Sequence, residues 1–462
     1  MWGIELCYKD EVSLSRQIFL SLKERILEGE LCQGEALPST RELSRGLNVS
    51  RNTVCEAYAM LLAEGFIVSH QGAATRVAEG LQIYTKKVPL PVVRKWEQMP
   101  ILWDFKTGQP DLSQFPRELW SRLVHEAAST ITPSQLEYSG PKGYEPLCDE
   151  IAHWLLRSRS MKVNPEDVFI TSGATEALYL LVEMLHKDGS SFVLENPSHQ
   201  AIRTAIFDRG YSVDWLMVDE QGADTSSLKG KDISAVYVTP SHQFPLGGIL
   251  PARRRATLLR LAMENDFYII EDDYDSEFRY SGSPISPIYS MDSSHVIYVG
   301  TFSKALFPAL RIGFVILPKP LQKKWRHYRN YMDVQNPILE QITLTHFLNR
   351  RKMDKHVGRM RKLYADKRCT LLNATHTLFG SSAQPWGDAS GLHLALQFSR
   401  MDFGEAFMQK CKDARLRIAS VTQYCPQKDN HRDKLLLGYG HLSHEQIQEG
   451  MKVLHKIITE MG

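Results

Sequence analysis

The stretch VIYVGTFSKALFPALRIGFVILP, residues 296–318, places one lysine and one arginine between two apolar segments. Both apolar segments have the length and composition of buried β-strands. Lys304 follows the first segment, and Arg311 precedes the second. A lone lysine at the edge of a core usually extends its amine to solvent. The function of Lys304 therefore has to be judged from the rest of the chain.

The composition describes a large globular protein with more than one domain. The chain has 462 residues, 43% of them hydrophobic and 23% charged, and its formal net charge is +2. This near-neutral balance alone indicates neither a nucleic-acid partner nor a membrane partner. The longest apolar run, near ALYLLVEML, contains Glu183 and is too short to cross a bilayer. We find no secretory signal and expect a cytoplasmic protein.

The cysteines favour neither a metal site nor a disulfide framework. The seven cysteines are scattered and include no C-x-x-C pair. Zinc sites and disulfide-rich domains both show regular cysteine spacing. An odd, dispersed set of thiols is typical of a reducing compartment.

From Trp103 onward, strand-length and helix-length segments alternate. Such alternation predicts an α/β domain whose mostly parallel sheet is covered by helices. The predicted strands are DVFITSG, SFVLENP, SAVYVTP, FYIIEDDY, VIYVGTF and RIGFVILP.

The first 79 residues follow a different pattern, which predicts a winged helix-turn-helix domain. Residues 12–28 form an amphipathic helix, and Ser39 with Glu42 makes a capping box for a short helix that ends at Gly46. Ser50 caps a second helix that runs to about Glu64, and residues 66–78 alternate like a hairpin. We predict a proline-containing, basic linker over residues 80–103 and a second domain over residues 104–462.

The second helix of a helix-turn-helix pair enters the major groove of DNA with its first turns. Here those turns carry Ser50, Arg51, Asn52 and Thr53, and Arg41 lies on the preceding helix. Arginine can read guanine, and asparagine can read adenine. The alternative is a solvated face, since residues 1–80 hold eight Lys or Arg residues against eleven Asp or Glu residues, a net charge of −3.

The chemistry open to Lys304 directs a search through the other strands. A lysine amine can condense with the aldehyde of pyridoxal phosphate, whose pyridine nitrogen needs a carboxylate. Asp272 ends the apolar segment FYIIEDDY, and Tyr274 follows two residues later. A carboxylate here would keep the ring protonated, and a phenol would approach the 3-oxygen. On its own, the DDYD sequence is more often a solvated turn.

A phosphate needs a helix N-terminus and a cation. The sequence DVFITSGATEALYLLVEML offers a strand, a small turn and a helix, so Gly173, Ala174 and Thr175 can present backbone N–H groups. Thr301, Ser303 and Arg311 would add hydroxyls and a guanidinium. Each piece alone is weak evidence, but their order on successive strands is a stronger indication.

The N-terminal segment GEALPSTRELSRGLNVSRNTVCEAYAMLLAEGFI resembles the DNA-binding domain of GntR-type bacterial regulators over residues 12–78. The resemblance implies that Arg41 and residues 50–53 approach DNA and that Gly72 lies at the tip of the wing. One departure is Ala74, where such wings usually carry a second glycine. Alanine adopts positive φ less freely than glycine, which puts a minor-groove contact of the wing in doubt.

The order of motifs from residue 103 to residue 460 resembles the fold type I pyridoxal-phosphate enzymes, the aspartate aminotransferase group. The resemblance implies that Lys304 bonds the cofactor, that Asp272 binds its ring nitrogen and that Tyr274 binds its 3-oxygen. It further implies that Arg311 binds the phosphate, that His199 stacks on the ring, that His242 and Gln243 line the ring, and that Tyr138 reaches the phosphate of a partner subunit.

The two modules together resemble the MocR/GabR regulators, a subfamily of the GntR-type regulators. TPSHQFPLG, IIEDDYDSEFRY, TFSKALFPALRIGF and FKTGQPDLSQFP are similar to that subfamily's own segments. The resemblance implies a transcription factor that senses an amine or amino-acid-like effector by forming an external aldimine. It also implies a head-to-tail homodimer that binds two half-sites on DNA.

Two alternatives remain open. The first is an active aminotransferase with a fused DNA-binding domain. Aminotransferases hold the substrate carboxylate with an arginine near the C-terminus, where this chain has Leu436. Arg203, Arg415 or Arg417 could anchor an effector instead, or pair on the surface, and His393 is either an effector contact or a core histidine. The second alternative is a DNA-binding scaffold that no longer holds a cofactor.

Overall fold

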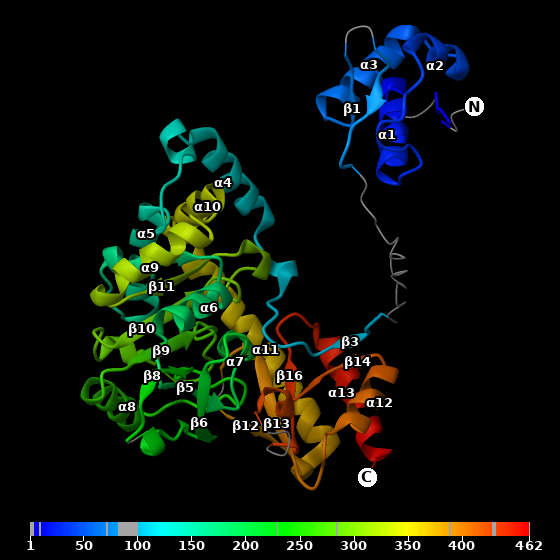
Figure 1. Ribbon diagram of the computed structural model, residues 1–462. Helices are drawn as coiled ribbons and strands as arrows, with labels where there is room; N and C mark the ends of the chain where they lie inside the picture. Colours follow the sequence, from blue (N-terminus) through cyan, green and yellow to red (C-terminus); the bar gives the residue numbers. More distant parts are fainter. Residues whose placement is uncertain are drawn as a thin grey trace. The chain divides into compact units, whose positions relative to one another are not determined.

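Figure 1 shows the computed structural model of the chain, which divides into two compact units, Met1–Glu97 and Gln98–Gly462. The structure describes residues 4–8, 11–70, 73–81, 100–228, 230–282, 285–387, 390–426 and 431–461. Most of the predicted linker, residues 82–99, therefore lies outside the described residues. Within the described parts, no helix is long and apolar enough to span a membrane. The two units are described separately below.

The N-terminal unit is a three-helix domain with a two-stranded wing. Its helices pack around a core in which Ile18, Leu22, Val54 and Leu61 have no exposed surface. β1 and β2 pair as an antiparallel hairpin. The elements are α1 (Leu14–Leu27), α2 (Thr40–Leu47), α3 (Arg51–Ala63), β1 (Ile67–Val68) and β2 (Arg76–Val77).

The two helices of the helix-turn-helix pair begin at the predicted caps. The backbone N–H of Glu42 donates to the Ser39 hydroxyl at 3.2 Å, and the backbone N–H of Ser39 donates to the Glu42 carboxylate at 2.9 Å. α2 does not end at Gly46 as predicted. It continues to Leu47, because Asn48 adopts the left-handed conformation (φ 54°) that closes the helix.

The C-terminal unit contains an eight-stranded sheet with the order β4-β11-β10-β9-β8-β5-β6-β7. β6, β5, β8, β9 and β10 run parallel, whereas β11 is antiparallel to both of its neighbours. All six predicted strands are present, and the predicted fold class is confirmed. The strands are β4 (Val168–Thr171), β5 (Ser191–Asn196), β6 (Ser212–Asp219), β7 (Gly222–Ala223), β8 (Ile233–Val238), β9 (Tyr268–Asp273), β10 (Val296–Thr301) and β11 (Gly313–Ile316).

Helices cover both faces of this sheet (Figure 1). Alternate residues of each strand belong to different hydrophobic clusters, for example Ile270 to one and Ile269 to the other. One face packs against α6 (Ala174–Leu185), α7 (Gln200–Phe207) and α9 (Lys319–Met332). The other packs against α4 (Arg117–Thr130), α5 (Glu145–Arg159), α8 (Ala252–Glu264), α10 (Ile338–Asn349) and α11 (Lys352–Phe379).

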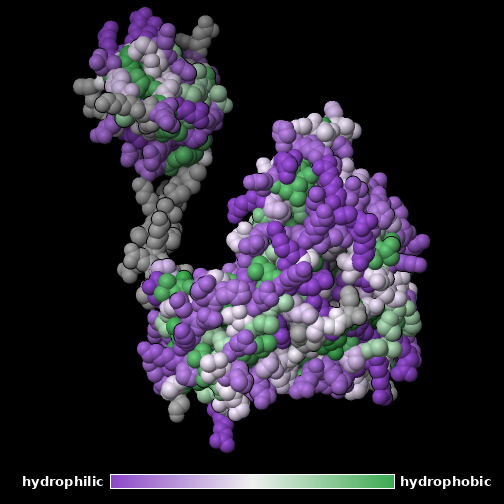
Figure 2. Space-filling model, turned by 180° about the vertical axis from the view of Figure 1, so that it is seen from behind, coloured by the Kyte–Doolittle hydropathy of each residue, from purple (hydrophilic) through white to green (hydrophobic). Residues whose placement is uncertain are grey.

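A second sheet, which the sequence did not predict, lies at the C-terminal end of the unit. Its order is β12-β13-β16-β15, and α11 connects the first sheet to it. A separate short pair joins β3 to β14 in parallel. The elements are β3 (Trp103–Asp104), β12 (Ala383–Trp386), β13 (His393–Phe398), α12 (Glu405–Asp413), β14 (Leu416–Arg417), β15 (Ala419–Ser420), β16 (Lys434–Gly438) and α13 (His444–Thr459). Figure 2 shows that hydrophilic residues cover most of the visible surface of the unit.

Candidate functional site

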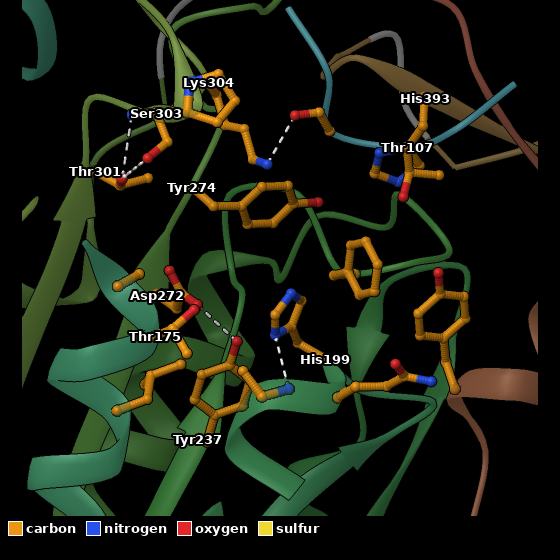
Figure 3. Close-up of a pocket in the computed structure, with 18 of the residues that line it drawn as sticks. Thr107, Thr175, His199, Tyr237, Asp272, Tyr274, Thr301, Ser303, Lys304 and His393 are labelled. Carbon is orange, nitrogen blue, oxygen red and sulfur yellow. Dashed lines mark hydrogen bonds between the residues drawn. The ribbon is translucent and has the colours of Figure 1, made fainter. Parts of the chain in front are cut away.

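A cavity of about 470 Å³ lies beyond the carboxyl ends of β8, β9 and β10, where parallel α/β sheets usually hold ligands. Figure 3 shows side chains of several segments that are distant in sequence around it. Ten of the predicted site residues line it: Ala174, Thr175, His199, Asp272, Tyr274, Thr301, Ser303, Lys304, Arg311 and His393.

Lys304 presents its amine at the wall of the cavity. Its Nζ donates a hydrogen bond to the carbonyl oxygen of Gly108 at 2.8 Å. Burial lowers the pKa of Lys304, the nearby Asp275 carboxylate opposes this, and Lys106 adds to it. A lowered pKa raises the fraction of neutral amine, which is the nucleophilic form. Gly108 has a positive φ of 67°, and a Cβ there would lie 2.6 Å from Nζ, so a side chain at this position would displace the amine.

Asp272, at the end of β9, offers one free carboxylate oxygen. Its Oδ2 accepts a hydrogen bond from the Tyr237 hydroxyl at 2.7 Å, while the buried Oδ1 has no partner among the described residues. Burial raises the pKa of Asp272 to about 7, although the Tyr237 bond acts in the opposite direction. A ligand that donates an N–H to Oδ1 would favour the ionised carboxylate. The protonated pyridine nitrogen of pyridoxal phosphate meets this requirement.

The end of the cavity that suits an anion lies where α6 begins. Gly173 caps α6 with φ 98° and leaves the first backbone N–H groups of the helix without a side-chain cap. A Cβ on Gly173 would lie 3.1 Å from Nη1 of Arg311, so the guanidinium lies beside the helix terminus. The Thr301 and Ser303 hydroxyls are 3.1 Å apart at the end of β10. A helix N-terminus, a guanidinium and two hydroxyls together suit a phosphate group.

The remaining wall is aromatic and includes two neutral histidines. Burial lowers the pKa of His199 to about 4 and that of His393 to about 3. Nδ1 of His199 accepts the backbone N–H of Ala201 at 3.2 Å, and Nε2 of His393 lies 3.2 Å from the Pro245 carbonyl. The His393 and Tyr274 rings are stacked, with centroids 6.5 Å apart.

The structure brings neither His242 nor Gln243 into the lining of the cavity. Nδ1 of His242 lies 3.0 Å from Oδ1 of Asp275 and 3.0 Å from the Tyr274 hydroxyl, so His242 supports Tyr274 from behind. The amide of Gln243 instead donates to the carbonyl oxygens of Pro197 and Phe244, at 2.9 and 2.7 Å. Both side chains organise the loop that positions the cavity wall.

Five other predicted residues also lie outside the lining, among them Arg417 and Gly173, which caps α6 beside it. Arg203 donates to the carbonyl oxygens of Cys425 and Gln423, at 3.0 and 3.2 Å, and so fixes the segment that carries Tyr424. Nε of Arg415 donates to the carbonyl oxygen of Pro100 at 2.8 Å. Tyr138 is 85% exposed.

Sequence reasoning missed Thr107, Gly108, Tyr237, Phe244 and Tyr424. All five residues line the cavity. The segment FKTGQPDLSQFP contains the first two residues, and its only signal is its similarity to the family's segments. Tyr237 has one signal in the sequence, a phenol near the end of a mostly apolar strand.

The predicted DNA-binding residues gather on the helix-turn-helix pair of the N-terminal unit. Arg41, Arg51 and Asn52 are exposed. The Ser50 hydroxyl caps α3 by accepting the Thr53 backbone N–H at 3.1 Å, and Nε of Arg51 donates to the Thr40 hydroxyl at 3.3 Å. Gly72, the predicted wing tip, lies outside the described residues.

Comparisons with known proteins match both units. Residues 14–77 match the family of bacterial regulatory proteins of the gntR type, and residues 101–421 match the class I and II aminotransferase family. The chain is 33% identical to the HTH-type transcriptional regulator YdeL of Bacillus subtilis, across 96% of both chains. It is 28% identical to the probable rhizopine catabolism regulatory protein MocR of Rhizobium meliloti, across 96% of this chain and 93% of that one.

A solved structure shows the same fold for the C-terminal unit. LysN, an α-aminoadipate aminotransferase of Thermus thermophilus complexed with N-(5'-phosphopyridoxyl)-L-leucine, superposes with a TM-score of 0.71 at 25% identity. The match covers 78% of this chain and 92% of LysN. The aminotransferase fold and such neighbours imply pyridoxal phosphate binding.

Asp272→Asn tests the cost of the buried carboxylate in cofactor-free protein. Because the folded-state pKa of about 7 exceeds the usual value of 3.8, the folded protein keeps a proton that the unfolded chain loses. Stability should therefore fall as the pH rises from about 4 to 7, by ~1.4 kcal/mol per unit of pKa shift. We expect Asp272→Asn to flatten the decline in urea-unfolding free energy between pH 4 and 7.

Asp149→Asn, which alters an exposed carboxylate of α5, is the matched control and should keep the wild-type pH profile. An Asp272→Asn profile that parallels the wild-type profile would contradict the assignment of a raised pKa to Asp272.

Proposed function

The chain belongs to the MocR/GabR subfamily of GntR-type transcriptional regulators, and we propose that it senses a small amine through pyridoxal phosphate held at Lys304. The family expected from the sequence is confirmed, and its helix-turn-helix domain implies DNA binding. We also propose the boundaries 1–79 for the DNA-binding domain, 80–103 for the linker and 104–462 for the effector domain.

The observation that carries the proposal is the alignment of three groups around one cavity. They are the Lys304 amine, the Asp272 Oδ1 that no described residue bonds, and the start of α6 with Arg311. When bound, pyridoxal phosphate would supply an aldehyde that bonds reversibly to a primary amine. Lys304 would hold that aldehyde, and Asp272 would accept the ring N–H.

Further residues would orient the cofactor. The phosphate would be held by the Gly173–Thr175 turn and by Thr301, Ser303 and Arg311.

Burial, with the charges of Asp275 and Asp272, raises the pKa of Tyr274 well above its ordinary value, so its hydroxyl stays a hydrogen-bond donor. His199 would lie against the ring, and Tyr138 would reach the site of a partner subunit in a head-to-tail homodimer. Such a dimer presents two DNA-binding domains to two half-sites.

An amine effector would replace Lys304 as the partner of the cofactor. His393, at the aromatic wall, is the residue of this chain best placed to contact it. Arg203 and Arg415 would anchor the effector only after releasing the backbone carbonyl oxygens to which they now donate hydrogen bonds. Leu436 is fully buried between β13 and β15, where an arginine would supply a carboxylate clamp in an aminotransferase. A leucine in place of that arginine favours a role in sensing an amine over catalytic transamination.

Lys304→Ala tests the cofactor proposal directly. We expect purified wild-type protein reconstituted with pyridoxal phosphate to show the visible absorption band of lysine-bound cofactor. Lys304→Ala should lack that band because its side chain has no amine, whereas Lys319→Ala, at an exposed lysine of α9, should retain it.

A wild-type protein without the band would refute the cofactor proposal. Steady release of keto product from an amine and a 2-oxo acid, at rates typical of enzymes, would instead favour the fused aminotransferase.

Arg51→Ala tests the DNA interface. If Arg51 contacts phosphate, the slope of log affinity against log salt should decrease by about one. If Arg51 reads guanine, discrimination at one base pair should weaken by about 1–3 kcal/mol. Fluorescence anisotropy on the cognate operator measures both quantities. Arg16→Ala on α1 is the control, and an unaltered affinity and salt slope for Arg51→Ala would remove Arg51 from the interface.

A further inference from the structure

A second cavity of about 290 Å³ lies in the C-terminal unit, and it shares no lining residue with the cavity at Lys304. Its walls come from the C-terminal end of α5, the segment that follows β9, and the N-terminal part of α11. Four arginines from these three segments line it: Arg157, Arg159, Arg279 and Arg361. Such a convergence of guanidinium groups is unusual for a cavity wall, because like charges repel when they are buried together.

Among the described lining residues, the ion pairs of the arginines can be followed one at a time. Arg157 forms a two-bond ion pair with Asp354, at 3.1 and 3.2 Å. Nε of Arg361 donates to the backbone carbonyl of Glu277 at 2.9 Å, a neutral acceptor that leaves the positive charge in place. The Glu277 carboxyl is 9% exposed, and burial raises its pKa to about 8, so it is mostly neutral at pH 7. Among the residues that the structure describes, the positive charge of Arg361 is therefore not matched by an ionised carboxylate at neutral pH.

Two hydrogen-bond donors of the lining also lack acceptors. Arg159 is 5% exposed, and its Nη2 forms an ion pair with Asp273 at 2.8 Å. Its buried Nε has no partner among the residues that the structure describes, and the same holds for the hydroxyl of Ser276. A buried donor without an acceptor costs about 1–3 kcal/mol. A ligand with several acceptor oxygens would satisfy both groups and offset the positive charge.

We propose that this cavity binds a small oxyanion, the phosphate or carboxylate group of a metabolite, at a site separate from the amine site. Guanidinium groups pair with planar and tetrahedral oxyanions through parallel hydrogen bonds. Trp154 and Val357 add apolar surface to the wall, which leaves room for a small organic portion of the ligand.

The location would couple this anion to the cofactor site. Ser276 and Glu277 lie in the segment that also carries Tyr274, and Arg159 holds Asp273, the neighbour of Asp272. Arg361 and Asp354 belong to α11, which continues to the second sheet and packs against β12. An anion bridging these three segments would favour one arrangement of the walls around Lys304, which is a structural route for a second effector.

Titration calorimetry with inorganic phosphate on the full-length protein, at constant ionic strength, tests the proposal. Phosphate can also bind at the α6 terminus when the cofactor is absent, so Arg311→Gln serves to remove that competing site. We expect phosphate binding to persist in Arg311→Gln and to weaken at least tenfold when Arg361→Gln is added. Ser276→Ala, which deletes one donor with little change of volume, should weaken it several-fold. Arg260→Gln, at an exposed arginine of α8, is the matched control.

Acetate in place of phosphate distinguishes a carboxylate ligand from a phosphate ligand, and tight binding of either supports the site. Two results would overturn it: heats with phosphate that equal those with chloride, or phosphate binding in the Arg311→Gln background that neither Arg361→Gln nor Ser276→Ala weakens. The Ser276→Ala result decides the question if Arg361→Gln fails to fold. Loss of the visible cofactor band would leave this test intact, so the two proposals fail independently.

Discussion

The buried carboxylate of Asp272 is the constraint on which the C-terminal unit depends. A carboxylate at the end of a central parallel strand is costly unless its oxygens are paired. Tyr237, on the neighbouring strand β8, satisfies one oxygen, and the other has no partner among the described residues. The sheet thus holds the acid beside a cavity where a ligand can complete its hydrogen bonding. A raised pKa follows from the same burial.

The rest of the cavity is arranged around that acid by close backbone packing. Gly313 allows β11 to approach the turn before α6, because a Cβ there would lie 2.8 Å from Cα of Gly173. Gly108 likewise leaves space for the Lys304 amine. The start of α6, the acid and the amine therefore lie on elements that pack into the two hydrophobic clusters. Tyr274 lines the cavity at Lys304, and Ser276 and Glu277 line the arginine-lined cavity, so one stretch of backbone contributes to both cavities.

The sequence was sufficient to predict the six strands that carry the site, because each is a short apolar run that ends in polar residues. The order of Gly173, Asp272 and Lys304 on those strands predicted their convergence. The sequence was not sufficient to predict the second sheet. Its strands are short, and they pair residues that are far apart in the chain, such as Leu396 with Leu435. Thr107 and Tyr424 reach the cavity through such long-range packing. His242 and Gln243 were expected in the lining, but hydrogen bonds with Asp275 and with backbone carbonyls hold them behind it.

We propose that bond exchange at Lys304 controls DNA binding. The affinity of the reconstituted full-length protein for its operator should be measured with and without a saturating amine, in wild type and in Lys304→Ala. The account predicts a change of about 5–150-fold in wild type, the usual range of allosteric coupling, and none in Lys304→Ala. An equal change in both proteins, or no change in wild type with any amine that shifts the cofactor spectrum, would contradict it.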